Sequence, residues 1–259
     1  MAASQGLQGR HALVTGGGRG IGAAIARQLL AQGAHVTVLG RRLDVVQALA
    51  AELPERLHAV RADVADADQV AAAFASARSR FGPLSILINN AGQAASAPFL
   101  KTDAALWQQM LSVNLTGTLL CTQAALPDML SSGWGRVVNI VSTAGLVGYA
   151  YVAAYCAAKH GVIGLTRALA LEVAKKGITV NAVCPGYTET DILRESIANV
   201  TAKTGRSADA ARAEFAAGNP QGRIVQPEEV ADTVQWLCGE AAASIHGQSI
   251  AVCGAEVML

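Results

Sequence analysis

The sequence predicts a single α/β domain in which helices cover both faces of a doubly wound parallel β-sheet of about seven strands. Three observations support this fold class. Short apolar runs alternate with longer helical patterns along the chain. Apolar residues make up 52% of the 259 residues and charged residues only 15%, as expected when strands are buried on both faces. The first apolar run ends in a glycine-rich turn that leads directly into a helical pattern.

The predicted elements follow one another without a linker. Strands are expected at residues 11–16, 35–40, 57–64, 84–89, 135–142, 179–185 and 248–253, where apolar residues cluster between turn residues. Helices are expected at residues 21–32, 44–53, 67–80, 103–131, 153–176 and 227–239, where apolar residues recur with helical spacing. Because no Pro-, Gly- or Ser-rich stretch divides this order, residues 1–259 are expected to form one domain.

The alternation breaks once, between residues 185 and 226. This stretch has no strand pattern, and short helices are expected at 192–203 and 208–217. In an open α/β sheet, ligands bind beyond the carboxyl ends of the strands. The segment at about 186–217 is therefore predicted to be a lid over such a crevice. A packing or subunit-contact insertion is the alternative.

Composition and charge exclude several function classes. The net charge is +1 and the chain has no basic run, which argues against nucleic-acid and membrane-surface binding. No run of about 18 apolar residues could span a membrane, and residues 1–8 lack an apolar signal core. A cytoplasmic protein is therefore expected. Its five cysteines lack the spacing of a disulfide framework or zinc site, and its histidines form no ligand cluster, so no metal is expected. These cysteines are Cys121, Cys156, Cys184, Cys238 and Cys253.

The turn after the first strand has the pattern of a dinucleotide-binding loop. Glycines let the backbone turn tightly and approach a pyrophosphate, and the following helix N-terminus offers free N–H groups. An ordinary tight turn is the alternative, although a strand before and a helix after favour binding. The residues expected to hold the cofactor here are Gly16, Gly18, Arg19, Gly20, Ile21 and Gly22.

Two further strand ends indicate which dinucleotide binds. The second strand ends at Gly40, and Arg41 and Arg42 follow where an acidic residue would hold a ribose 2′-hydroxyl. Guanidinium groups suit a 2′-phosphate, so NADP(H) is favoured over NAD(H), which stays open. A solvated arginine pair is the alternative. The third strand ends in Asp63 and Val64, and the carboxylate can accept a hydrogen bond from an adenine amino group.

The fourth strand ends in Asn89, Asn90, Ala91 and Gly92. The amides can brace the loop against which the cofactor lies, and the glycine permits close approach. A simple strand-end turn is the alternative.

The chemistry-bearing residues are Ser142, Tyr155 and Lys159, and Asn114 lies within the helix expected at 103–131. Tyr155 and Lys159 are four residues apart, so a helix places both on one face. A cation beside a phenol favours the phenolate, which predicts a lowered pKa for Tyr155 and proton transfer near neutral pH. By itself, such a pair is more often a solvated lysine beside a packed tyrosine. Asn114 interrupts an apolar helix face, and a buried, satisfied asparagine is its alternative reading.

Together these motifs resemble the short-chain dehydrogenase/reductase family and its Rossmann-type fold. T-G-x-x-x-G-x-G, N-N-A-G, Ser, Y-x-x-x-K and P-G occur in family order over residues 9–254. The resemblance implies that Tyr155 is the acid/base and that Ser142 orients and polarises the substrate carbonyl. It implies that Lys159 binds the nicotinamide ribose and that Asn114 holds a water of a proton relay. Pro185, Gly186 and Thr188 would meet the nicotinamide end of the cofactor.

Residues 160–172 and 177–190 resemble 3-oxoacyl-thioester reductases, aromatic polyketide ketoreductases and 3-hydroxybutyrate dehydrogenases. The resemblance implies interconversion of a 3-oxoacyl and a 3-hydroxyacyl group, carried on coenzyme A. A secondary alcohol, polyketide or cyclic diol substrate is the alternative, and a non-catalytic dinucleotide sensor a remote one. The expected pocket wall consists of Gln93, Ala94, Ala144, Leu146, Tyr149, Tyr151, Tyr187 and Ile192.

The resemblance also implies a homotetramer, in which helices 103–131 and 153–176 pack across a two-fold axis. The last strand departs from the family pattern, because it ends in Val252, Cys253, Gly254 and Ala255 where many relatives have Asp-Gly-Gly. The subunit contacts expected at this end are therefore in question.

Overall fold

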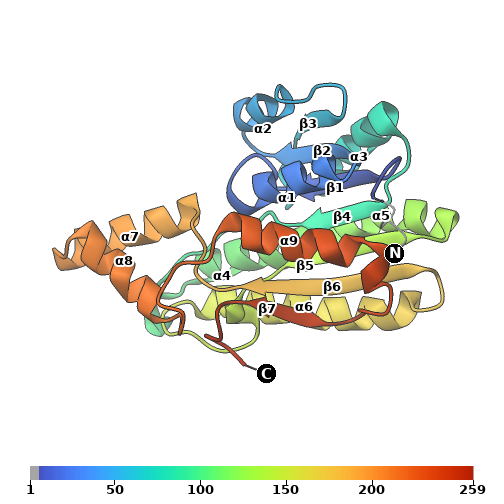
Figure 1. The fold of residues 1–259 in the computed structure, drawn as a ribbon. Helices are drawn as coiled ribbons and strands as arrows, with labels where there is room; N and C mark the ends of the chain where they lie inside the picture. The colour runs from blue at the N-terminus through green and yellow to red at the C-terminus, as the bar shows by residue number, and fades with distance from the viewer. Residues whose placement is uncertain (1–5, 259) are drawn as a thin grey trace.

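The structure, a computed structural model, describes residues 6–258 and contains a seven-stranded parallel sheet (Figure 1). The strand order is β3-β2-β1-β4-β5-β6-β7, and every neighbouring pair is parallel. The order reverses between β1 and β4, as in a doubly wound sheet. The predicted fold class is confirmed. The strands are β1 (His11–Thr15), β2 (His35–Gly40), β3 (Leu57–Arg61), β4 (Ile86–Asn89), β5 (Gly135–Ile140), β6 (Ile178–Pro185) and β7 (Ser249–Val252).

Helices cover both faces of this sheet. One apolar core lies between the sheet and helices α1, α2 and α9, and a second lies between the sheet and α3, α5 and α6. All residues of β5 and β6 are buried, which explains the apolar composition. The α-helices are α1 (Gly20–Ala31), α2 (Leu43–Ala50), α3 (Ala67–Phe81), α4 (Ala104–Leu111), α5 (Gly117–Ser132), α6 (Ala153–Val173), α7 (Asp191–Thr204), α8 (Ala208–Ala217) and α9 (Pro227–Cys238).

The prediction of a single long helix at 103–131 is wrong in one respect. It is divided into α4 and α5 by a π-helical turn at Ser112–Thr116, in whose centre Asn114 lies. A π turn takes up one extra residue and often marks a functional position. The apolar periodicity continues through the turn, so the sequence pattern could not reveal it.

Strands β3 and β5 end more than one residue earlier than predicted. β3 ends at Arg61 and β5 at Ile140, although Val64 and Val141 beyond them are buried. The apolar pattern follows burial, and burial extends past the last paired residue of each strand.

The interruption after β6 is confirmed as two helices, α7 and α8, which project beyond the carboxyl ends of the strands (Figure 1). They form a small core of their own from Leu193, Ile197, Ala211 and Ile224. A parallel bridge between Thr188 and Val225 closes the base of this segment. Across residues 6–258, every helix is too short or too polar to cross a membrane.

Candidate active site

A cleft of about 1470 Å³ opens at the carboxyl ends of the strands, where the sheet order reverses, and it extends beneath α7. Ligands of doubly wound folds bind at this place. Every residue predicted to bind the cofactor lines the cleft: Gly16, Gly18, Arg19, Gly20, Ile21, Gly22, Arg41, Arg42, Asp63, Val64, Asn90, Ala91, Gly92, Tyr155, Lys159, Pro185, Gly186 and Thr188.

The glycine loop is built for close approach of a ligand. Gly16 and Gly20 have φ values of 62° and 52°, which disfavour other residues. A Cβ added to Gly22 would lie 2.3 Å from the Gly16 carbonyl oxygen. The α1 N-terminus carries no side-chain cap, and Gly20, Ile21 and Gly22 of its first turn line the cleft. These features fit the pyrophosphate of a dinucleotide.

Asn90 braces this loop, as the sequence predicts. Its Nδ2 donates to the carbonyl oxygens of Thr15 at 2.9 Å and Gly16 at 3.1 Å. The hydroxyl of Thr15 in turn accepts from the backbone N–H groups of Asn90 and Ala91, both at 2.9 Å. The ends of β1 and β4 are thus tied together beneath the cleft.

The cleft is basic beside the end of β2. Arg41 and Arg42 follow the end of β2, are exposed and line the cleft. Arg19 also lines it, and its guanidinium pairs with Asp191 of α7 at 2.6 Å. Asp63 uses one carboxylate oxygen to accept from the N–H of Ala65 at 3.0 Å, which leaves the other for a ligand. The residues present therefore fit a dinucleotide that carries a 2′-phosphate.

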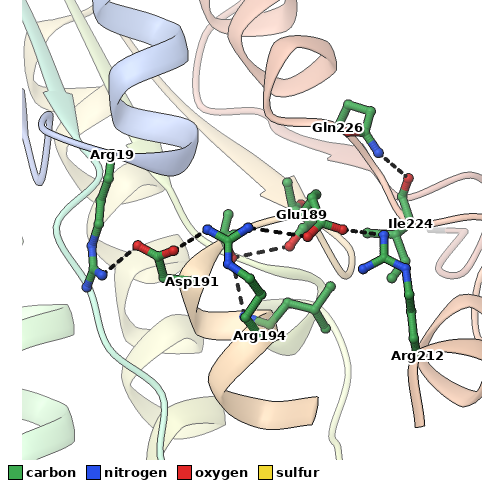
Figure 2. A network of polar contacts seen from close by, with 10 residues as sticks. Arg19, Glu189, Asp191, Arg194, Arg212, Ile224 and Gln226 are labelled. Atoms are coloured by element: carbon green, nitrogen blue, oxygen red, sulfur yellow. Dashed lines mark hydrogen bonds and ion pairs between the residues drawn. The ribbon is translucent and has the colours of Figure 1, made fainter. Parts of the chain in front are cut away.

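Ion pairs continue from the glycine loop into the segment above the cleft (Figure 2). Asp191 contacts Arg194 as well as Arg19, and Arg194 reaches Glu189 at 3.4 Å. Glu189 also contacts Arg212 of α8. The cofactor loop and both helices of the segment thus share one charged network.

Ser142, Tyr155 and Lys159 converge in the cleft from two elements. Ser142 lies at the N-terminus of the 3₁₀ turn Thr143–Gly145, where its Oγ accepts from the Ala144 N–H at 3.1 Å. Tyr155 and Lys159 lie on the first turns of α6. The Lys159 Nζ is 5.7 Å from the centre of the Tyr155 ring and donates to the Ile140 carbonyl at 2.9 Å. The prediction that Tyr155 and Lys159 lie on one face of a helix is confirmed.

The predicted lowering of the Tyr155 pKa by Lys159 is wrong for this structure. Desolvation raises the pKa of Tyr155 to about 12, and interaction with the Ser142 hydroxyl only partly opposes it. Burial also lowers the pKa of Lys159 to about 8. The surrounding protein disfavours both charged forms, so Tyr155 is a protonated phenol at neutral pH.

Asn114 is buried behind Lys159 and does not line the cleft. Its Nδ2 donates to the carbonyl oxygens of Gln93 and Met110, both at 3.0 Å, and its Oδ1 accepts from the Gln93 N–H at 3.2 Å. A Cβ added to Gly92 would lie 2.9 Å from Asn114 Oδ1 and 3.7 Å from Lys159 Nζ. Asn114 thus lies near Lys159 across Gly92, and its water relay stays a prediction.

The substrate end of the cleft has most of the predicted wall. Gln93, Ala94, Ala144, Tyr149, Tyr151, Tyr187 and Ile192 all line it. Leu146 does not, and that prediction is wrong. The 3₁₀ turn before it directs Leu146 into a buried cluster with Val141, Val162 and Ile163.

The sequence does not predict one contact of this wall, between Tyr149 and Glu256. The Tyr149 hydroxyl donates to Glu256 Oε1 at 2.6 Å, across 107 positions of the chain. No spacing or motif links these two residues, so only the folded chain reveals the pair.

Comparison with known proteins decides the family. Residues 10–201 match the protein family described as short chain dehydrogenase. The chain belongs to this family. It is an oxidoreductase that acts on CH–OH groups, and its family binds NAD or NADP.

Three similar proteins cover almost the whole chain. Cis-4-hydroxycyclohexanecarboxylate dehydrogenase of Sinomonas cyclohexanicum is 41% identical over 248 residues, which cover 95% of both proteins. The 3-oxoacyl-acyl-carrier-protein reductase of Aquifex aeolicus is 37% identical over 252 residues, covering 96% of this chain and 97% of that protein. The solved structure of an actinorhodin polyketide ketoreductase variant with NADPH superposes with a TM-score of 0.91 at 39% identity, covering 95% of this chain and 96% of that one.

Proposed function

We propose that this dehydrogenase interconverts a 3-oxoacyl and a 3-hydroxyacyl group, carried as a coenzyme A thioester, with NADP(H) as the favoured cofactor. The observation that carries the reaction is the convergence of Ser142, Tyr155 and Lys159 at one point of a cleft whose other end is a glycine cradle. The substrate class is supported by the relatives named as reductases of 3-oxoacyl and polyketide substrates.

In the proposed reduction, the residues of the chain bind the carbonyl oxygen and supply its proton. The hydroxyls of Ser142 and Tyr155 donate hydrogen bonds to this oxygen, and Tyr155 transfers its proton as negative charge develops there. When bound, the reduced nicotinamide supplies the hydride. Lys159 holds the nicotinamide ribose, and a water held by Asn114 links Lys159 to solvent, from which the lost Tyr155 proton is replaced.

The raised pKa of Tyr155, about 12, is compatible with a proton donor in the reductive direction. Oxidation of an alcohol needs the phenolate, which the protein alone disfavours.

Arg41, Arg42 and Arg19 support the preference for NADP(H), because no acidic residue stands at the end of β2. The cofactor-binding roles proposed here are those of the cleft-lining residues above. A cytoplasmic homotetramer is proposed on the family resemblance, with α4, α5 and α6 at its two-fold interfaces.

A spectrophotometric screen tests this function. The purified protein is offered acetoacetyl-CoA, free ketones and secondary alcohols with NADPH or NADH, and cofactor oxidation or reduction is followed. The proposal expects the highest kcat/KM for the thioester with NADPH. Activity on ketones with none on thioesters would favour a secondary alcohol or cyclic alcohol dehydrogenase, the class to which the relative from Sinomonas belongs by name.

The Tyr155→Phe variant separates an enzyme from a dinucleotide sensor. It should reduce kcat by about 100- to 10 000-fold because the proton donor is lost. Cofactor affinity should remain, since the phenol ring and Lys159 are kept. Unchanged turnover in this variant would disprove the tyrosine-based mechanism.

A further inference from the structure

The C-terminal turn places an acidic side chain behind the wall of the cleft, against Tyr149 and Gly186. Glu256 lies in the turn that follows β7, where its N–H donates to the Cys253 carbonyl at 3.2 Å. Ala255 adopts a left-handed φ of 71°, which a non-glycine residue rarely holds without compensating contacts. A Cβ added to Gly186 would lie 2.6 Å from Glu256 Oε2, so the carboxylate lies directly behind Gly186.

The carboxylate determines the hydrogen bonding of Tyr149. This phenol lines the cleft, and its only proton goes to Glu256 Oε1 at 2.6 Å. The Thr143 hydroxyl lies 2.9 Å from the same phenolic oxygen. Because a carboxylate only accepts and a phenol has one proton, Thr143 donates to Tyr149. Tyr149 therefore has no proton left to donate to a ligand in the cleft.

The negative charge at this wall is not balanced. The ion pairs found among residues 6–258 do not include Glu256. Its Oε2 is buried without a hydrogen-bond partner in the described part of the chain. The charge also contributes to raising the pKa of Tyr187, after burial, and Tyr187 is another residue of the same wall.

We propose that Glu256 is a positioning and charge-selecting residue, which orients Tyr149 and makes this wall reject substrates with a free carboxylate while accepting uncharged acyl groups. This inference rests on the proposed function and deepens it. Among acyl substrates, the charge of Glu256 favours the thioester, whose carbonyl is neutral, over the corresponding free 3-oxo acid. At an effective dielectric of about 20, like charges repel one another more strongly than in bulk water, so a free carboxylate at this wall should bind about tenfold or more weakly.

Steady-state kinetics with acetoacetyl-CoA and free acetoacetate test this selection. The full-length wild type should prefer the thioester. Glu256→Gln keeps an acceptor for the Tyr149 hydroxyl but removes the charge. It should raise kcat/KM for acetoacetate by about tenfold or more, while the value for the thioester stays within about threefold.

Two further variants separate charge from position. Glu256→Ala removes the partner of Tyr149 and should raise KM for the thioester by about tenfold with a smaller effect on kcat, whereas Glu256→Gln should not. Glu55→Gln removes one charge from an exposed turn outside the cleft. It should leave kcat/KM unchanged for both acetoacetate and the thioester. Equal changes for both substrates in Glu256→Gln, or a wild-type preference for acetoacetate, would overturn the proposal.

Failure of the proposed function is distinguishable from failure of this inference. If the wild type reduces neither acetoacetyl-CoA nor acetoacetate but does reduce cyclohexanone, the acyl function is wrong. Cyclohexanone and 4-oxocyclohexanecarboxylate then form the matched pair for the same variants. If Glu256→Gln raises kcat/KM for the carboxylate alone, the proposed rejection of carboxylates by Glu256 is supported. Equal effects on both ketones refute it.

Discussion

Replacement of Gly22 by alanine tests the cradle at the base of the cleft. The added Cβ would lie 2.3 Å from the Gly16 carbonyl oxygen and 2.6 Å from Asn90 Nδ2. Real Cβ atoms essentially never approach within 3.0 Å, so the loop must move. The groups in the way are a backbone carbonyl and the amide that bonds to Thr15 and Gly16, and neither is a flexible side-chain end.

The size of the effect follows from these contacts. Overpacking of this kind costs about 1–3 kcal/mol. Loss of one Asn90 hydrogen bond adds about 1 kcal/mol. The free energy of unfolding should therefore fall by about 2–4 kcal/mol, which for a domain of this size lowers the Tm by roughly 4–16 °C. Displacement of the Gly16 backbone also removes N–H groups from the pyrophosphate site, so the Kd for NADPH should rise at least about tenfold.

Thermal unfolding and fluorescence titration with NADPH measure both effects. Gly218→Ala is the matched control, because Gly218 has right-handed helical backbone at the end of α8, lies outside the cleft, and an added Cβ would have its nearest neighbour at 3.6 Å. This control should stabilise the helix slightly and leave the Kd unchanged. A Gly22→Ala protein with wild-type Tm and NADPH affinity would refute the close packing of Gly16, Gly22 and Asn90 and the cradle inferred from it.

Three other predictions concern cofactor choice, the charged network and pH. Arg41→Asp should weaken NADPH binding at least about tenfold and favour NADH in titrations, because it places a carboxylate at the 2′-phosphate; tighter binding of NADH by the wild type would contradict the arginine reading. Asp191→Asn should tighten NADPH binding about threefold and leave NADH unchanged, because it frees Arg19 from its 2.6 Å ion pair; equal effects on both cofactors would contradict this competition. Burial lowers the pKa of His11 from 6.5 to about 4, so the unfolded chain binds the proton more strongly and stability should fall by about 3 kcal/mol as the pH falls from 6.5 to 4. Urea unfolding should show this loss in the wild type beyond that in His11→Asn, and equal pH profiles would contradict it.

The sequence by itself determined the fold, and it predicted the reacting groups that we propose. Strand and helix order follows from the alternation of short apolar runs and amphipathic patterns, because burial on a sheet or helix imposes these periods. The loop from Gly16 to Gly22 and the pair Tyr155 and Lys159 depend on short local spacing. Such spacing places side chains on one turn or one helix face whatever the rest of the chain does.

The tertiary structure decided what depends on distant residues. Burial raises the pKa of Tyr155, and the hydrogen bond with Ser142 opposes this only in part. Asn114 lies in a π turn that the apolar pattern does not reveal, and Leu146 is directed away from the cleft by the turn before it. Glu256 meets Tyr149 across 107 positions, a contact that only the folding of the C-terminal turn onto the end of β6 creates.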